Sequence, residues 1–268
     1  MGFSALEVGA ASPVGELVLA RPERLNALSA TTLRELRDAA RWFDARPEVR
    51  VVVVRGRGRS FCAGADLREP PVAEARPESG LSWSERREIG QLGHRMATAV
   101  EEMRAITVAS VHGHVIGGGL VLMLACDLRV AAADARFRIP EVELGIPLAW
   151  GGIPRLVREI GPSRTRDLVM TGRPFDAAEA LALGVVNRVA EPDQLADATR
   201  DLVDALLERP EVPLAITKEH VAAVARSIAG ATAFADGDAL LASVFDPESL
   251  EAARRYLGAR GLRDRDDR

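Results

Sequence analysis

The feature that most constrains the fold is a run of four consecutive valines, residues 51–54, within the segment Val49–Arg55. A continuous β-branched run lacks the apolar and polar alternation of a half-exposed strand, and it is typical of a strand buried on both faces of a parallel sheet. Parallel neighbours need a crossover between them, and that crossover is usually a helix. The run therefore predicts a layered α/β fold.

Strand and helix patterns alternate through the rest of the first half. Strands are predicted at Glu16–Ala20, Thr107–Val111, Leu128–Ala131 and Arg136–Ile139, and helices at 29–42, Ser82–Met103 and Leu120–Ala125. This β-α-β-α-β-α-β order predicts a mostly parallel sheet with right-handed crossovers. From Gly151 onward the chain is predicted to be helical except for a strand at Val185–Ala190, with later helices at Pro213–Ile228 and Pro247–Leu257.

Composition narrows the class of protein. The chain has 268 residues, 47% of them hydrophobic, which suffices for one large domain or one domain with a helical appendage. A net charge of -4 argues against a broad nucleic-acid surface. The two cysteines, Cys62 and Cys126, do not make a disulfide framework, and the first residues do not resemble a signal peptide. We therefore expect a reducing, cytoplasmic location without a membrane span.

Two segments that follow predicted strands carry the chemistry, at residues 60–67 (SFCAGADL) and 112–119 (HGHVIGGG). The small residues of the first let a backbone approach a ligand closely, and the second opens a helix, whose first N–H groups are unpaired and partly positive. One backbone donor from each segment would form an oxyanion hole. A thioester enolate needs such donors, because removal of its α-proton places charge on the carbonyl oxygen. Each segment alone is more typical of a packing turn; the pair is more specific.

Five short motifs resemble one family. They are RPERLNAL at 21–28, FCAGADL at 61–67, GGG at 117–119, CD at 126–127 and PE at 140–141. Together they resemble the crotonase (enoyl-CoA hydratase/isomerase) superfamily, over about Leu17 to Val189. The resemblance implies an α/β spiral of ββα units at 1–195 that holds the acyl-CoA site. It also implies a C-terminal helical subdomain at 196–268 for trimerisation and as a lid over the pocket.

The resemblance also implies ligands, partners and binding residues. The substrate is an acyl-CoA thioester, no separate cofactor is needed because CoA is part of the substrate, and the assembly is a homotrimer or a dimer of trimers. No metal, nucleic-acid or membrane partner is predicted. The oxyanion-hole donors are the backbone N–H groups of Ala65 and Gly118. Residues assigned to substrate and CoA binding are Arg24, Leu25, Ala63, Asp66, Leu67, Gly117, Pro140 and Leu144.

One carboxylate stands out for acid–base chemistry, which requires a group beside the reacting carbon with a suitable pKa. Glu141 lies between Pro140 and Val142, so partial desolvation should raise its pKa. By resemblance it holds the place of one of the two catalytic glutamates of enoyl-CoA hydratases. Val121 occupies the place of the other glutamate, and a valine cannot hold or protonate a water.

The missing second glutamate decides which reaction we expect. A single carboxylate can move a proton between two carbons, so we expect enoyl-CoA double-bond isomerisation with Glu141 as the single base. The alternatives are hydration of 2-enoyl-CoA by Glu141 alone and a non-catalytic acyl-CoA-binding protein. Leu148 and Trp150 stand where hydratases usually have a glycine-rich stretch. They either close the water pocket or merely pack at a helix entry. A Rossmann-type dinucleotide site is excluded, because the glycine run lacks the G-x-G-x-x-G spacing.

Overall fold

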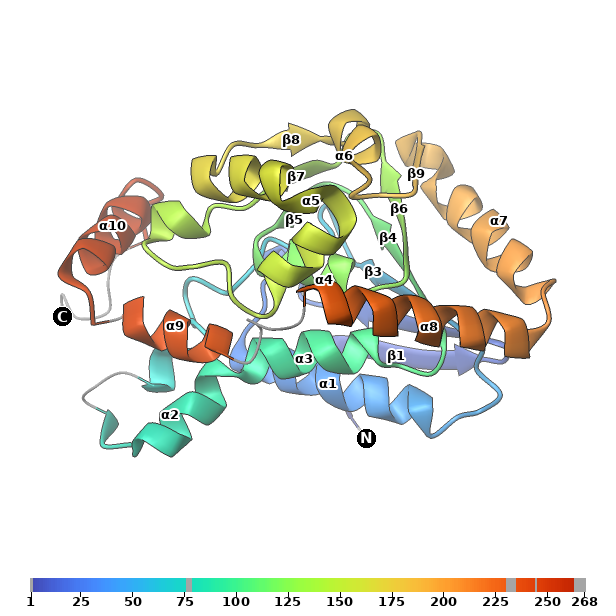
Figure 1. The fold of residues 1–268 in the computed structure, drawn as a ribbon, viewed down its shortest axis with the longest axis horizontal. Helices are drawn as coiled ribbons and strands as arrows, with labels where there is room; N and C mark the ends of the chain where they lie inside the picture. The colour runs from blue at the N-terminus through green and yellow to red at the C-terminus, as the bar shows by residue number, and fades with distance from the viewer. Residues whose placement is uncertain (1, 76–78, 230–234, 244, 263–268) are drawn as a thin grey trace.

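The structure is a computed structural model that describes residues 2–75, 79–229, 235–243 and 245–262 (Figure 1). Within these residues the centre is a six-stranded sheet in the order β1-β2-β3-β4-β6-β9. Its strands are β1 (Leu6–Ala11), β2 (Val14–Leu19), β3 (Val51–Gly56), β4 (Ile106–Val111), β6 (Leu128–Ala132) and β9 (Arg188–Ala190). β1 is antiparallel to β2, and every other neighbouring pair is parallel. The mostly parallel sheet that the sequence predicted is therefore confirmed.

The four-valine run occupies the middle of this sheet and contacts a helical layer on each face. Val52 and Val54 pack into the main core with α1 (Ala30–Asp44) and α3 (Leu92–Glu101). Val51 and Val53 belong to a second cluster with Leu195, Leu202 and Val203 of α7 (Leu195–Leu207). Because successive side chains of a strand point to opposite faces, one run supplies both cores.

A second, smaller sheet contains β5 (His114–Ile116), β7 (Arg136–Arg138) and β8 (Phe175–Asp176), in the order β5-β7-β8. The strand predicted at Arg136–Ile139 exists as β7, but it belongs to this sheet. β5 and β8, with two or three residues each, carry too short a pattern to be predicted. The buried helix α4 (Gly118–Leu124) follows β5 directly. This sheet therefore positions the glycine run.

One helix and two strands differ from the prediction. The single helix expected at Ser82–Met103 is wrong, because the chain forms α2 (Trp83–Gly90) and then α3, with a break at Gln91. At that break Gly90 lies against α9 (Asp236–Ser243), where a Cβ on Gly90 would be 3.1 Å from the carbonyl oxygen of Gly237. The close approach of α9 accompanies the change of direction. The strand expected at Val185–Ala190 is shorter, and β1 at the exposed edge of the sheet was not predicted.

The remaining helices complete the molecule. They are α5 (Gly152–Thr171), α6 (Ala177–Leu183), α8 (Glu211–Ala229) and α10 (Pro247–Gly258), with short 3-10 turns that include η1 (Pro22–Arg24) and η4 (Glu141–Leu144). In Figure 1, α9 and α10 lie at one end of the molecule, and α10 is beside η4. Within the described residues, no helix is both long enough and apolar enough to cross a membrane. A domain boundary at residue 195 stays a prediction.

Candidate active site

The two loops that the sequence singled out run side by side. Cys62 and Val115 form a parallel β-bridge. The backbone N–H of Cys62 donates to the carbonyl oxygen of His114 at 3.0 Å, and the N–H of Ile116 donates to the carbonyl oxygen of Cys62, also at 3.0 Å. The bridge continues the order of β3 and β4, which are parallel neighbours in the sheet. Adjacent parallel strands thus bring together two loops that are fifty residues apart in the chain.

Ala65 and Gly118 each lie three residues beyond this bridge. A Cβ built on Gly64 would be 2.8 Å from the carbonyl oxygen of Ile116 and 3.7 Å from the nitrogen of Gly118, so the loops stay in contact. Leu28 forms a parallel β-bridge with Ala65: the N–H of Leu28 donates to the carbonyl oxygen of Gly64, and the carbonyl oxygen of Leu28 accepts from the N–H of Asp66. In this pattern the N–H of Ala65 points away from Leu28. Among the residues that the structure describes, no group accepts a hydrogen bond from the N–H of Ala65 or Gly118. Both donors are free for a ligand.

The N–H of Gly118 is exposed by the way in which α4 begins. Gly117 is the N-cap and has a φ of 47°, in the region that favours glycine. This conformation turns the chain sharply from β5 into the helix, so Gly118 is the first helical residue. Its N–H is one of the unpaired donors of a helix N-terminus, where negative charge is stabilised.

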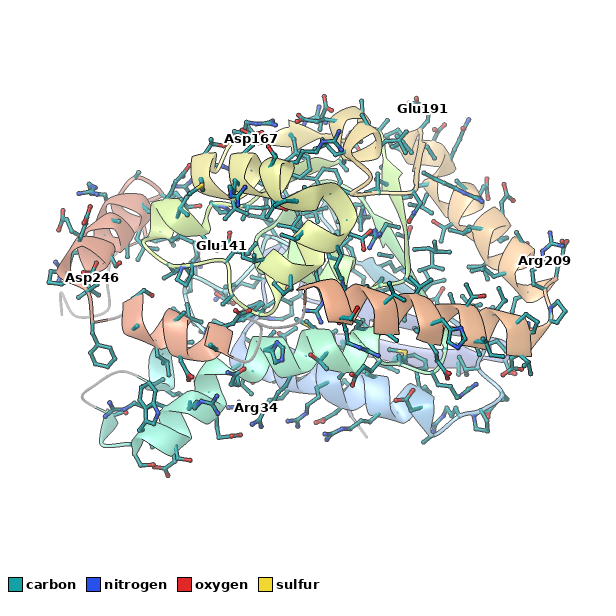
Figure 2. The ribbon with its side chains drawn as sticks, in the orientation of Figure 1. Arg34, Glu141, Asp167, Glu191, Arg209 and Asp246 are labelled. Carbon is teal, nitrogen blue, oxygen red and sulfur yellow. The ribbon has the colours of Figure 1, made fainter. Side chains whose placement is uncertain are left out.

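Glu141 lies on η4 directly after Pro140, on the other side of this turn. Its side chain is buried, with 9% of the residue exposed, and in Figure 2 it lies toward the inside while the other labelled charged residues lie around the outline. A Cβ added at Gly117 would collide with its Oε1. Its Oε2 has no hydrogen-bond partner among the described residues. Burial raises the pKa of Glu141 to about 7, which confirms the predicted desolvation.

A cavity of about 260 Å³ joins these groups. Of the predicted site residues, those that line it are Ala63, Ala65, Asp66, Leu67, Gly117, Gly118, Pro140, Glu141 and Leu144. Arg24 and Leu25 lie behind this wall: Arg24 contacts Asp66, and the carbonyl oxygen of Leu25 accepts the N–H of Ala63 at 3.0 Å. The predicted set is thus brought to one place, apart from these two residues.

The cavity has further walls for which the sequence analysis named no residues, although the family resemblance implied a C-terminal lid over the pocket. They come from the segment Pro70–Ala73 and from the C-terminal helices, with Leu240 on α9 and Leu250, Ala253, Tyr256 and Leu257 on α10. The spacing of the α10 residues is that of one helix face, so an amphipathic pattern was available. It could not reveal which surface that face covers.

Asp66 is the second carboxylate on the cavity wall, and both of its oxygens already accept hydrogen bonds within the protein. Arg21 and Arg24 contact it at 3.0 and 3.2 Å, and the backbone N–H groups of Arg68 and Glu69 donate to it at 3.0 and 3.2 Å. Burial alone would raise the pKa of Asp66, but these two N–H groups and the two guanidinium groups lower it below its ordinary value. Asp66 is a charged structural group that caps the following segment.

At position 121, where the family resemblance places the second glutamate of hydratases, this chain has a valine surrounded by apolar side chains. Val121 is fully buried on α4, and a Cβ on Gly152 would be 2.9 Å from its Cγ2 and 2.7 Å from Cγ of Leu148. A Cβ on Gly118 would collide with the indole of Trp150. Leu148 therefore packs beside Val121, and Trp150 covers the first residue of α4, so large apolar side chains form this part of the cavity wall.

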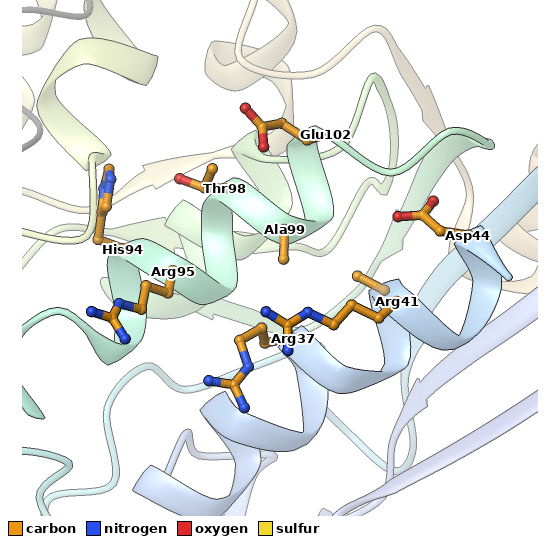
Figure 3. A pocket seen from close by; sticks show the side chains of 9 residues that line it. Arg37, Arg41, Asp44, His94, Arg95, Thr98, Ala99 and Glu102 are labelled. Atoms are coloured by element: carbon orange, nitrogen blue, oxygen red, sulfur yellow. The ribbon is translucent and has the colours of Figure 1, made fainter. Parts of the chain in front are cut away.

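A larger hollow of about 530 Å³ lies elsewhere, between α1 and α3 (Figure 3). Its charged residues include Arg37 and Arg41 on α1 and Arg95 on α3. Arg37 and Arg41 contact Asp38, and Arg95 contacts Glu88. These arginines contact carboxylates at the surface, so the smaller apolar cavity with the unpaired carboxyl is the candidate active site.

Comparison with known proteins agrees with this geometry. The family model for enoyl-CoA hydratase/isomerase matches residues 9–261. The crotonyl-CoA hydratase of Syntrophomonas wolfei is 35% identical over 203 residues, 75% of each chain. A probable enoyl-CoA hydratase of Rhizobium meliloti is 38% identical over 197 residues, 73% of this chain and 72% of that protein. The crystal structure of an enoyl-CoA hydratase from Mycobacterium avium subsp. paratuberculosis superposes with a TM-score of 0.84 at 26% identity, covering 94% of this chain and 99% of that one.

The chain therefore belongs to the enoyl-CoA hydratase/isomerase (crotonase) family. It is an acyl-CoA enzyme with the α/β fold and C-terminal helices of that family, so the predicted family and fold are confirmed. The relatives named here are hydratases. They favour the hydration alternative over the isomerisation that the sequence analysis placed first.

Proposed function

We propose that the protein hydrates 2-enoyl-CoA thioesters, with Glu141 as the only carboxylate that moves protons. The names of its relatives support hydration as the reaction. One observation supports the residue: the carboxyl of Glu141 is buried, its Oε2 has no partner among the described residues, and it lies against the turn that precedes Gly118. A buried polar group without a partner is destabilising, so its retention indicates a functional role.

In this proposal the N–H groups of Ala65 and Gly118 hold the thioester oxygen. Water attacks C3 of the enoyl group, the C2=C3 electron pair moves into the thioester, and the oxygen becomes an enolate stabilised by the two donors. Glu141 takes a proton from the water and returns it to C2, which regenerates the carboxylate and yields a 3-hydroxyacyl thioester. A pKa of about 7 suits a group that must both accept and release a proton near neutral pH.

The rest of the predicted site is proposed to bind the acyl-CoA. Leu67, Gly117, Pro140 and Leu144 would contact the acyl thioester, because they line the same cavity as Glu141. The nucleotide end of CoA would lie near Arg24, Leu25, Ala63 and Asp66, and the contacts of Arg24 and Asp66 would come from their backbone groups. The homotrimer, or dimer of trimers, is likewise a proposal from the family resemblance.

A second candidate is isomerisation of 3-enoyl-CoA to 2-enoyl-CoA. The side chains of Val121, Leu148 and Trp150 favour it, because they offer no acceptor for the hydrogens of a water. Glu141 would remove a proton from C2 and return it to C4, and the intermediate would be a dienolate whose oxygen is held by the same two N–H groups.

The test is to incubate the purified protein with 2-enoyl-CoA and, separately, with 3-enoyl-CoA, and to identify the products by chromatography. The expected result is 3-hydroxyacyl-CoA from the 2-enoyl substrate. Conversion of 3-enoyl-CoA without any hydration would replace the proposal with isomerisation. Tight binding of both thioesters without turnover would identify an acyl-CoA-binding protein.

A further inference from the structure

The cavity raises the question of which group assists Glu141. Among the described residues that line it, three carry titratable side chains: Asp66, Glu141 and Tyr256. Asp66 is held by two arginines and two backbone N–H groups, so it is not available to a substrate. Tyr256 is the only tyrosine of the chain, and its side chain is half-buried on α10. This elimination leaves its hydroxyl as the second titratable group that could serve the reaction.

The helix that carries Tyr256 packs against the turn that carries Glu141. A Cβ on Gly145, at the end of η4, would collide with the carbonyl oxygen of Ser249 on α10. Leu250, Ala253 and Leu257 of the same helix face the cavity. Figure 1 shows α10 beside η4 at this end of the molecule. The helix that carries Tyr256 is therefore packed on the turn that carries Glu141, and both residues line the same cavity.

The electrostatic surroundings keep the Tyr256 hydroxyl protonated. Burial raises its pKa; Arg260 and Arg138 act to lower it, and the carboxylates of Glu143 and Glu141 act to raise it. The net pKa lies above the ordinary value of a tyrosine. The phenol is thus a neutral hydroxyl, which both donates and accepts hydrogen bonds, within the electrostatic reach of Glu141.

The wall formed by Val121, Leu148 and Trp150 offers no acceptor for the hydrogens of a water. Val121 and Leu148 have no polar side-chain atom, and the indole N–H of Trp150 can donate but not accept, whereas a reacting water needs at least two polar partners to be held in a defined orientation. Glu141 supplies one of these partners. The other must come from a different wall of the cavity.

We propose that the hydroxyl of Tyr256 is a second catalytic residue, which holds the reacting water together with Glu141. This inference rests on the proposed hydratase function. One hydrogen of the water points to Glu141 and the other to the oxygen of Tyr256. The first proton moves to Glu141 as the water oxygen bonds to C3, and Glu141 then passes it to C2. Tyr256 keeps its own proton throughout, so no bond to it breaks.

The test compares two reactions in the full-length protein and its Tyr256→Phe variant. The first is hydration of 2-butenoyl-CoA; the second is exchange of the α-protons of butanoyl-CoA in D2O, followed by NMR, which needs Glu141 but no bound nucleophilic water. Hydration is expected to fall about 10²-fold because the water loses its orientation. The exchange rate is expected to change less than about threefold, because the base and its pocket stay in place.

A matched control is Arg260→Ala, because the guanidinium of Arg260 lies 3.5 Å from the centre of the Tyr256 ring. This change removes the packing on the ring but leaves the hydroxyl, and both rates are expected to stay within about twofold of the parent. A Tyr256→Phe variant that hydrates as fast as the parent overturns the inference alone. Equal losses in hydration and exchange also overturn it, since they identify a structural role. A parent protein that exchanges α-protons but hydrates no enoyl-CoA overturns the proposed function as well.

Discussion

The loop after β3 and the turn after β7 each place one buried carboxylate on the same cavity. The two carboxylates differ in their hydrogen-bond partners and in the direction in which their pKa is shifted. Asp66, with 2% exposed, receives two arginines and two backbone N–H groups, and its pKa is lowered. Glu141, with 9% exposed, has an oxygen without a partner, and its pKa is raised to about 7. Both side chains are shielded from solvent, but Glu141 is the more deeply enclosed, so deeper burial and the lack of partners together set its pKa apart.

This difference in partners distinguishes a structural carboxylate from a reactive one. A charge with full compensation stabilises the fold and has nothing left to offer a substrate. A buried carboxyl without compensation destabilises the fold but can exchange a proton near neutral pH. The loop of Asp66 therefore shapes the cavity, and in the proposed mechanism the turn of Glu141 would supply the chemistry. Each prediction below tests one side of this contrast.

The largest effect is expected from Glu141→Gln. The amide keeps the shape of the side chain but cannot carry a proton, so kcat should fall about 10³-fold while acyl-CoA binding, measured by calorimetry, is retained. The matched control is Glu143→Gln on the same turn, whose carboxylate contacts Arg138 at 2.5 Å. That variant should keep kcat within a few-fold. Similar losses in both variants would contradict the assignment of Glu141.

The next effect concerns pH and distinguishes the two carboxylates by sign. Glu141 titrates at 4.5 in the unfolded chain and about 7 in the fold, so between these values only the native state keeps the proton. Stability from this group should therefore fall as pH rises from 4.5 to 7, by about 3 kcal/mol in total. Urea unfolding of the parent and of Glu141→Gln at several pH values measures how stability changes with pH. The variant should lack the part of this change that Glu141 contributes. Identical slopes would show that the pKa is not raised.

The rate should follow the same ionisation in the opposite direction. Glu141 must be a carboxylate to accept a proton from water, so kcat/KM is expected to rise through about pH 7 and to level off above it. A profile measured from pH 5 to 9 checks this. A rise centred near pH 4.5 would mean that the base is a solvated carboxylate.

The smallest effect is expected from Asp66→Asn, on stability. The charge-assisted bonds from Arg21 and Arg24 weaken, which should cost about 2 kcal/mol at neutral pH. Since the pKa of Asp66 is lowered from 3.8 on folding, its contribution is present above that value and is lost as pH falls through the lower folded pKa. The deficit of the variant in urea unfolding should therefore shrink in acid. A loss of kcat as large as that of Glu141→Gln would refute the contrast.

The sequence by itself determined the features that depend on local pattern. The valine run predicted a buried parallel strand, the two small-residue loops followed neighbouring strands, and Glu141 stood between apolar residues after β7. Periodicity and chain order are local properties, and parallel strands bring the loops at their carboxyl ends together. The resemblance to the family rested on motifs of this kind.

Only the tertiary structure decided what surrounds those loops. The helical face of α10 carries a local pattern, but its position over the cavity depends on contacts with η4, more than a hundred residues earlier. The same holds for Asp66, whose partner Arg21 lies forty-five residues away, and for the packing of Trp150 against Gly118. Long-range packing and desolvation are set by the whole fold, and they decide which of two similar carboxylates stays free to react.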